Sequence, residues 1–87
     1  MPSPKPFRLT GHARSQLDFR GTSEREVCDA IRTVSWQPAE SCRLECRKDF
    51  RFDADWNQRH YATKQVHPIF VEEPEEIVVV TVYVYCF

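Results

Sequence analysis

Three polar residues near the start of the chain have the types and the spacing of an acid–base site. His12, Gln16 and Arg20 recur at every fourth position, so a helix would align them on one face. In a functional interpretation, His12 acts as general acid or base on an RNA 2′-hydroxyl, and Arg20 stabilises the charge that grows on the phosphate. In a structural interpretation, which we favour, His12 caps the helix and hydrogen-bonds the sheet, while Arg20 pairs with an acidic residue.

A second group of candidates lies later in the chain and consists of His60, Tyr61, Lys64, His67 and Tyr83. Metal-independent RNA cleavage needs a proton acceptor, a proton donor and cations around the phosphate, and these residue types can supply all three. Strand alternation puts Tyr61 and His67 on one face and His60 and Lys64 on the other, so Lys64 and His67 are not expected to act together unless a bulge resets the register. The candidate catalytic set is therefore His12, Arg20, Tyr61, Lys64 and Tyr83.

Metal and cofactor sites have less support in the sequence. The only close pair of cysteines is Cys42 and Cys46, and no second pair has the spacing of a zinc finger. We therefore predict no metal site and interpret Cys28 and Cys86 as small core residues. Since Gly11 and Gly21 are the only glycines, there is no glycine-rich phosphate loop, and we expect no cofactor.

The composition is that of one small folded domain without a membrane segment. The 87 residues are 41% apolar and 29% charged, which is ordinary for a folded protein. All 12 Lys and Arg lie in residues 1–71, but this excess is far below that of a dedicated nucleic-acid-binding domain. The apolar segment 77–87 is too short for a membrane helix, which needs about 20 residues. With no apolar secretory segment at the N-terminus, we expect a cytoplasmic protein with reduced cysteines.

Two short helices are predicted after a flexible tail over residues 1–6 and a short strand over 7–10, where the single domain 7–87 begins. Thr10 is a candidate N-cap for a helix over 11–20, and Gly21 suits the position after its end. Ser23 and Glu26 form a capping box that begins a second helix over 24–34. Pro38 disfavours helical dihedrals in the residue before it, so this helix must end nearby.

An antiparallel sheet is predicted over the rest of the chain. Residues 43–53 alternate as a half-buried strand, 53–57 form a turn, 59–71 form a second strand, and 72–76 connect to a third over 77–87. Pro68 indicates a bulge or a sheet edge in the second strand. The outward row of the first strand alternates in charge, which favours a solvated, internally paired face over a track for phosphates; its members are Arg43, Glu45, Arg47, Asp49 and Arg51.

The last strand has two different faces. The face expected to pack on the helices carries Val78, Val80, Val82, Val84 and Cys86. The other face carries Ile77, Val79, Thr81, Tyr83, Tyr85 and Phe87. Because the second face is aromatic and partly polar, we expect it to be a wet binding surface or to be covered by another subunit.

Four short motifs link the chain to a known family: His12-Ala13, the R-G-T-S run over residues 20–23, Y-A-T-K-Q-V over 61–66, and I-V-V-V-T-V-Y over 77–83. Over roughly residues 8–87 the chain resembles a family of small domains of unknown function related to the bacterial toxin–antitoxin superfamily of RelE and ParE type. The resemblance implies a β-α-α-β-β-β order with both helices packed on one face of a twisted, three- to four-stranded antiparallel sheet. In better-known relatives the activity is cleavage of messenger RNA or inhibition of gyrase. Gln16 occupies the place of an arginine expected in the first helix, whereas Arg20 matches a second one.

Two functional hypotheses follow for this α+β domain. The first, toward which we lean, is a noncatalytic protein-interaction module that pairs with itself as a homodimer or with a cognate antitoxin-like protein. The alternative is a metal-independent ribonuclease toxin that cleaves mRNA, with RNA or the ribosome as its partner.

Overall fold

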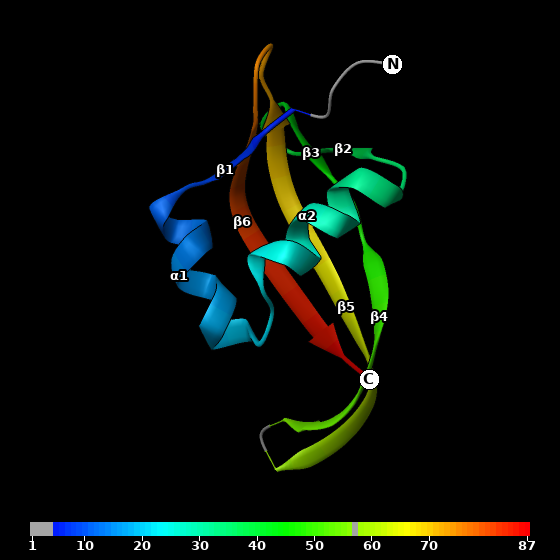
Figure 1. Cartoon of the computed structure of the whole chain (residues 1–87). Helices are drawn as coiled ribbons and strands as arrows, with labels where there is room; N and C mark the ends of the chain where they lie inside the picture. The colour runs from blue at the N-terminus through cyan, green and yellow to red at the C-terminus, as the bar shows by residue number, and fades with distance from the viewer. Residues whose placement is uncertain (1–4, 57) are drawn as a thin grey trace.

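The first half of the chain forms two capped helices. The computed structural model describes residues 5–56 and 58–87, and within them α1 spans Gly11–Arg20 and α2 spans Glu24–Thr33 (Figure 1). The Thr10 hydroxyl accepts a hydrogen bond from the Ala13 amide at 3.1 Å, and Gly21 ends α1 with a left-handed φ of 74°. The Ser23 hydroxyl caps α2 by accepting from the Glu26 amide. The predicted caps are confirmed, and α2 ends one residue earlier than predicted.

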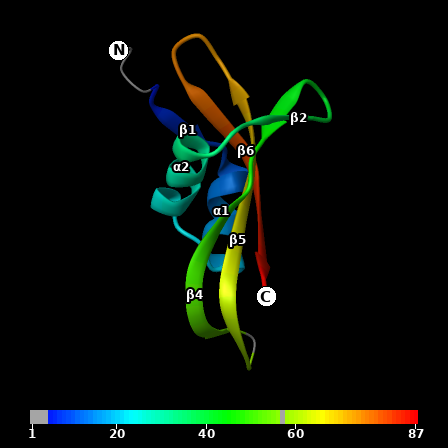
Figure 2. The ribbon, with the colours of Figure 1, turned by 90° about the vertical axis from the view of Figure 1, so that its right-hand side faces the viewer.

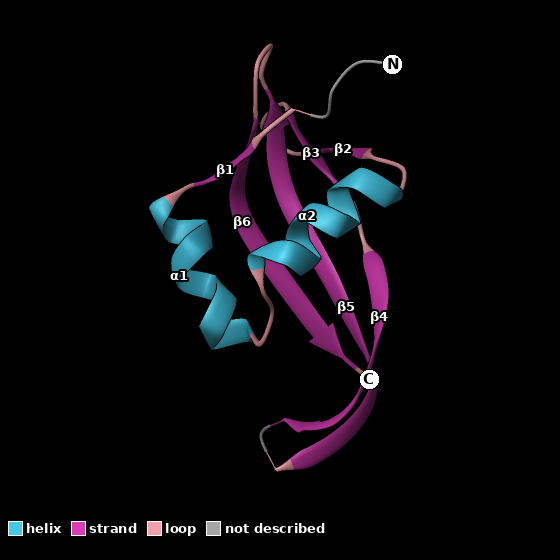
Figure 3. Cartoon of the chain, in the orientation of Figure 1, coloured by secondary structure: helices cyan, strands magenta, loops and turns pink. Residues whose placement is uncertain are grey.

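The strands form one mostly antiparallel sheet, which confirms the predicted α+β class. Among the described residues there are six: β1 Phe7–Leu9, β2 Gln37–Ala39, β3 Arg43–Glu45, β4 Lys48–Trp56, β5 Arg59–Glu72 and β6 Ile77–Cys86 (Figure 3). Their order is β1-β6-β5-β3-β2, with β4 also paired to β5, and only β1 and β6 run parallel. The sheet has more strands than the three or four expected for two reasons: β2 forms where the sequence indicated only a helix end, and the single strand predicted over residues 43–53 is divided into β3 and β4.

Pro68 divides the predicted strand over residues 43–53 into two. β3 and β4 follow one another along the same side of β5 in one register, with Leu44 opposite Phe70 and Lys48 opposite Val66. Between them the Cys46 amide donates to the Pro68 carbonyl at 3.4 Å, and proline has no N–H to donate in return. Pro68 lies in the central strand, so the alternative of a sheet edge is wrong. The alternative of a bulge is confirmed nearby, between Ile69 and Phe70.

That bulge also changes which residues of β6 face the helices. Ile69 pairs with Thr81 but Phe70 pairs with Val79, so Val80 is the extra residue. The core cluster accordingly takes Ile77 and Val79 together with Val82, and Val84 packs against it. The predicted assignment of Val78 and Val80 to the helix side is therefore wrong, whereas that of Val82 and Val84 is confirmed.

The β4–β5 hairpin is longer than predicted and extends past the helices (Figure 2). The expected turn over residues 53–57 is wrong for residues 53–56, which belong to β4, while residue 57 lies outside the described residues. Asp53 has a φ of 46° and marks a register shift between Arg51 and Ala54. The end of β4 lies against the turn after α1. The Trp56 ring is so close to Gly21 that a Cβ built on this glycine would lie 3.2 Å from it.

The segment before β1 is attached to the sheet where the structure describes it. The Lys5 ammonium lies 3.0 Å from the Glu72 carboxylate, and the Pro6 carbonyl accepts from the Ile77 amide at 2.9 Å. Residues 1–4 of the predicted tail lie outside the described residues. Neither described helix is long and apolar enough to cross a membrane.

Candidate functional site

One face of the sheet carries most of the groups that could bind or react. Both helices lie on the opposite side (Figures 1 and 2). We define the open face by the side chains of Glu45, Gln65, His67, Tyr83 and Tyr85. Strand pairing brings them together, because His67 is opposite Tyr83 and Gln65 is opposite Tyr85.

His67 is the buried centre of the open face. Its Nε2 lies 3.1 Å from the Glu45 carboxylate, its side chain is only 7% exposed, and its Nδ1 is buried without a hydrogen-bond partner among the described residues. Burial lowers the pKa of His67, the nearby Arg47 lowers it further, and Glu45 opposes both effects. A neutral ring that donates from Nε2 to the carboxylate leaves Nδ1 with a lone pair, which makes it a proton acceptor.

Tyr83 adjoins this histidine, and Arg20 in turn contacts Tyr83. The His67 and Tyr83 ring centroids are 5.7 Å apart, and the Arg20 guanidinium carbon lies 5.4 Å from the Tyr83 centroid, as in a cation–π contact. The Nε of Arg20 is also buried without a partner among the described residues. In the part of the chain that the structure describes, no carboxylate forms a salt bridge with Arg20, in contrast to our structural interpretation of this residue.

Gln16 positions α1 so that Arg20 reaches this site. Its side-chain oxygen accepts from the Val82 amide at 2.9 Å and from the Thr81 hydroxyl at 2.8 Å. Because the Val82 N–H points away from β5, this contact holds α1 along the free side of β6. Gln16 thus has a structural role here.

Two cavities flank the Arg20–Tyr83 contact. One of about 360 Å³ lies between the β2–β3 turn and the open face, and its lining includes Arg43, His67, Thr81 and Tyr83. The other, of about 350 Å³, is lined by Phe19, Arg20, Trp56, Tyr61, Val84 and Cys86. Arg20 and Tyr61 of the candidate set therefore share a cavity, and Arg20 contacts Tyr83.

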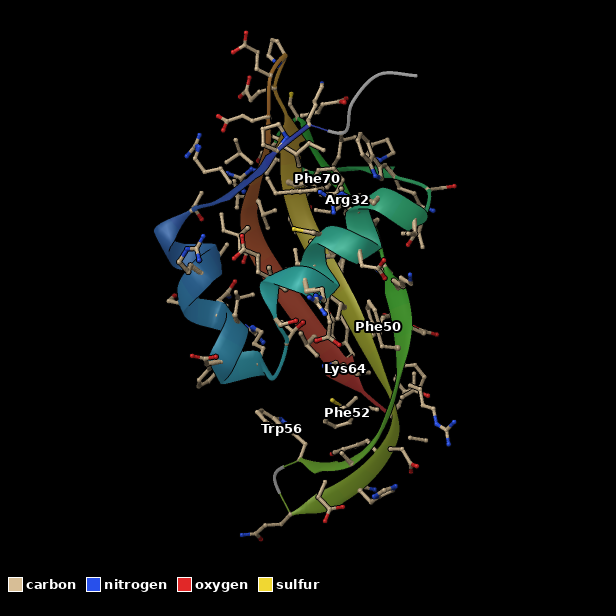
Figure 4. The ribbon with its side chains drawn as sticks, viewed as in Figure 1. Arg32, Phe50, Phe52, Trp56, Lys64 and Phe70 are labelled. Atoms are coloured by element: carbon tan, nitrogen blue, oxygen red, sulfur yellow. The ribbon has the colours of Figure 1, made fainter. Side chains whose placement is uncertain are left out.

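Lys64 lies on the helix side and is fully engaged there (Figure 4). Its ammonium donates to the Glu26 carboxylate at 2.8 Å and to the Gly21 carbonyl at 2.9 Å, and its side chain is 8% exposed. These bonds tie β5 to the α1–α2 turn. The structure does not bring Lys64 together with Tyr83, which lies on the open face.

His12 is also apart from the Arg20–Tyr83 contact. It is exposed in the first turn of α1, where Thr10 provides the N-cap instead. Eight residues of helix separate it from Arg20, which corresponds to about 12 Å along the axis.

His60 illustrates a different environment at the far end of β5. Its ring nitrogens lie 3.1 Å from Asp55 and 3.0 Å from Asp53. The hydrogen bond with Asp55, followed by that with Asp53, raises the pKa of His60. The exposed, carboxylate-bound ring is typical of a hairpin contact.

Among the described residues, the charged row of β3 and β4 is internally paired only at Glu45 and Arg47, so the predicted pairing is found in part. Arg47 lies 3.7 Å from Glu45, and Asp49 accepts a hydrogen bond from the Gln65 amide at 2.9 Å. All four cysteines are free thiols, and burial raises the pKa of Cys46 to about 11. Within residues 5–56 and 58–87, no three His, Cys, Asp or Glu residues lie close enough to hold a metal ion.

The sequence did not indicate that Tyr83 would contact both His67 and Arg20. A regular hairpin continuing the Glu72–Ile77 pair would put His67 opposite Val82, and only the bulge at Val80 shifts Tyr83 into that place. Pro68 was the available signal, because it pointed to an irregularity in this part of the sheet.

Comparisons of the chain with protein-family models, with curated proteins and with solved structures find no match in any of the three.

Proposed function

We propose that this domain is a noncatalytic protein-interaction module whose open face receives a partner protein. The observation that carries the proposal is an exposed aromatic row at the end of the chain. Tyr83, Tyr85 and Phe87 are 38%, 49% and 60% exposed, respectively, and the Arg20 guanidinium lies over the first of them. Neighbouring exposed aromatic side chains mark interaction sites more often than isolated ones.

The chemistry of the surface fits a protein better than a nucleic acid. Aromatic residues and arginine are enriched among the residues that dominate protein–protein binding energy. A phosphate backbone would instead be met by an excess of positive charge, and here Glu45 and Asp49 interrupt the row of arginines. The partner we infer presents apolar side chains to the aromatic row and a carboxylate to Arg20. The family resemblance supports an antitoxin-like protein as that partner.

The dispersed candidate catalytic residues also support a noncatalytic role. Lys64 is held by Glu26 on the helix side, and His12 is exposed about two turns of helix away from Arg20. An acid–base mechanism needs its groups within hydrogen-bond reach of one substrate. Only Arg20, Tyr61 and Tyr83 of the candidate set adjoin one another through a contact or a shared cavity.

Affinity capture with matched variants tests the proposal. A protein recovered with the unmodified domain should be lost with the double variant Tyr85→Ser/Phe87→Ser and retained with Arg25→Ser. Arg25 is the appropriate control because it is exposed on α2, away from the aromatic row. The recovered partner is then titrated against all three proteins, and the double variant should bind at least about tenfold more weakly, or about 1.4 kcal/mol. If every recovered protein binds the double variant as well as the unmodified domain, the open face is not the docking surface.

A ribonuclease is the second candidate because of one observation: the unpaired Nδ1 of His67 lies beside the Tyr83 ring, which Arg20 also contacts. Such a ring could accept the proton of an RNA 2′-hydroxyl, and Arg20 could stabilise the phosphate charge. A mixed RNA pool, with and without ribosomes, should then be cut by the unmodified domain and by His12→Ala but not by His67→Gln or Arg20→Ala. Intact RNA with the folded, unmodified domain under both conditions would reject this candidate.

A further inference from the structure

The longest uncovered sheet edge in the described part of the chain belongs to β4. β1 and β2 each offer only three residues, and Gln16 occupies the free side of β6 at Val82. β4 spans nine residues and pairs only with β5, as its position at the border of the sheet in Figure 1 shows. Unpaired edges of this kind are templates for pairing with another chain.

The ladder with β5 determines which backbone groups of this edge are free. The Cys46 amide bonds to Pro68 across the ladder, and the following pairs alternate between hydrogen-bonded and non-hydrogen-bonded. Even-numbered residues therefore bond to β5. The odd-numbered residues Arg47, Asp49 and Arg51 direct their N–H and C=O groups outward, away from the sheet.

The side chains along this edge are complementary to a second copy of themselves. In an antiparallel pair centred on Phe50, Asp49 lies opposite Arg51 of the second copy, and Arg51 lies opposite Asp49 of that copy. The two Phe50 rings meet on the symmetry axis, and opposite charges directly across a ladder stabilise it. The two neighbouring registers are centred on Asp49 and on Arg51. The first would place Arg47 opposite Arg51, and the second would place the two copies of Arg51 opposite each other.

We propose that two copies of this domain pair through their β4 edges, antiparallel and centred on Phe50, to form one continuous sheet across a two-fold axis. Such an interface is isologous, so each charge pair occurs twice. The pairing covers residues 48–52, because the positive φ of Asp53 and the register shift beside it end the regular edge. Arg51 is available for the contact, since its side chain is 89% exposed and its nearest carboxylate, Asp53, is 3.9 Å away.

A second copy fits this edge better than an unrelated strand because the edge carries both Asp49 and its complementary residue Arg51. A domain of this size also buries a modest share of its surface, so association adds stability. The proposal does not depend on the open face, which remains accessible on one side of the continuous sheet.

Charge reversal at two exposed positions tests the register. Asp49→Arg alone and Arg51→Asp alone each place like charges across the axis, twice per dimer, whereas a mixture of the two variants restores opposite charges in the heterodimer. Sedimentation velocity over a concentration series should show a dimer for the unmodified domain. For each variant alone, the dissociation constant of the dimer should be at least about tenfold higher. Native mass spectrometry of the mixture should show dimers with one chain of each kind. Arg25→Asp, an exposed reversal on α2, serves as the control and should leave the dimer unchanged.

Two further measurements separate this interface from the open face. Hydrogen exchange at the Asp49 and Arg51 amides should slow as protein concentration rises, because these N–H groups become paired. Tyr85→Ser/Phe87→Ser should leave the dimer intact, even if it abolishes binding of another protein. The proposal is overturned if the unmodified domain stays monomeric up to about millimolar concentration, if the single charge variants dimerise as well as it does, or if the open-face variant dissolves the dimer.

Discussion

The two faces of the sheet differ in whether their buried polar groups have hydrogen-bond partners. On the helix side, Lys64 is bonded to Glu26 and Gly21, and the Thr22 hydroxyl also donates to Glu26. On the open face and at its border, the Nδ1 of His67 and the Nε of Arg20 are buried without partners among the described residues. Buried polar groups are normally satisfied. Polar residues on the helix side are therefore satisfied within the fold, whereas the open face and its border hold two buried polar atoms that the described residues leave unsatisfied.

The largest effect is expected from the apolar part of the helix side. Phe70 is fully buried and packs edge-on against Trp36 with ring centroids 5.0 Å apart. Phe70→Ala should lower the free energy of unfolding by about 3–5 kcal/mol, because it removes buried apolar contacts and leaves a cavity. Urea denaturation followed by tryptophan fluorescence measures this loss. A loss below about 1 kcal/mol would mean that the helices do not pack on this face as described.

The next largest effect is expected at Lys64. Lys64→Met leaves the Glu26 carboxylate in a partly buried site without its cation and should cost about 1–3 kcal/mol of unfolding free energy. Lys48 is a matched control on the same side of the sheet, since it pairs with Asp29 at 2.6 Å but both side chains are more exposed. Lys48→Met should therefore cost less than about 1 kcal/mol in the same denaturation experiment. Equal losses of unfolding free energy at the two lysines would contradict the claim that burial makes the Lys64–Glu26 pair more stabilising than the Lys48–Asp29 pair.

The third prediction uses pH to compare His67 on the open face with His60 near the start of β5. The pKa of His67 is lowered from 6.5 by burial, so its contribution to stability is complete above about pH 6.5 and is lost as the pH falls toward its folded pKa. The pKa of His60 is raised from 6.5 by two aspartates, so its contribution is complete below about pH 6.5 and is lost as the pH rises through its folded pKa.

Denaturation of the unmodified domain, His67→Gln and His60→Gln between about pH 5.5 and 8 tests both signs. Relative to the unmodified domain, His67→Gln should become less damaging on acidification, and His60→Gln should become more damaging. The same pH dependence in both variants would mean that the two rings share one environment.

The sequence predicted the elements that depend on local chemistry. The Thr10 and Ser23 caps and the Gly21 helix end were all found where expected, because each depends on a side chain and a backbone group within a few residues. Strand alternation likewise placed Lys64 and His67 on different sides of the sheet.

The candidate site depended on long-range geometry that the sequence does not contain. The bulge at Val80 decides that Tyr83 rather than Val82 faces His67, and it arises from strand pairing across the hairpin. Arg20 reaches Tyr83 because Gln16 binds the free side of β6. In this contact Gln16 accepts from the Val82 amide, which is 66 positions away in the sequence. Neither contact could be inferred from spacing along the chain, so the sequence offered His67, Tyr83 and Arg20 as candidates without showing which of them would touch.

The smallest change in stability is expected at the open face, where the functional change should be largest. Tyr85 is 49% exposed, so Tyr85→Ser removes little buried surface and should change the free energy of unfolding by less than about 0.5–1 kcal/mol. The same variant should weaken binding of an open-face partner, because a large aromatic contact is lost. Unfolding curves and a binding titration on one preparation measure both effects. A variant that loses stability without losing affinity would place Tyr85 among the structural residues and remove the distinction between the two faces.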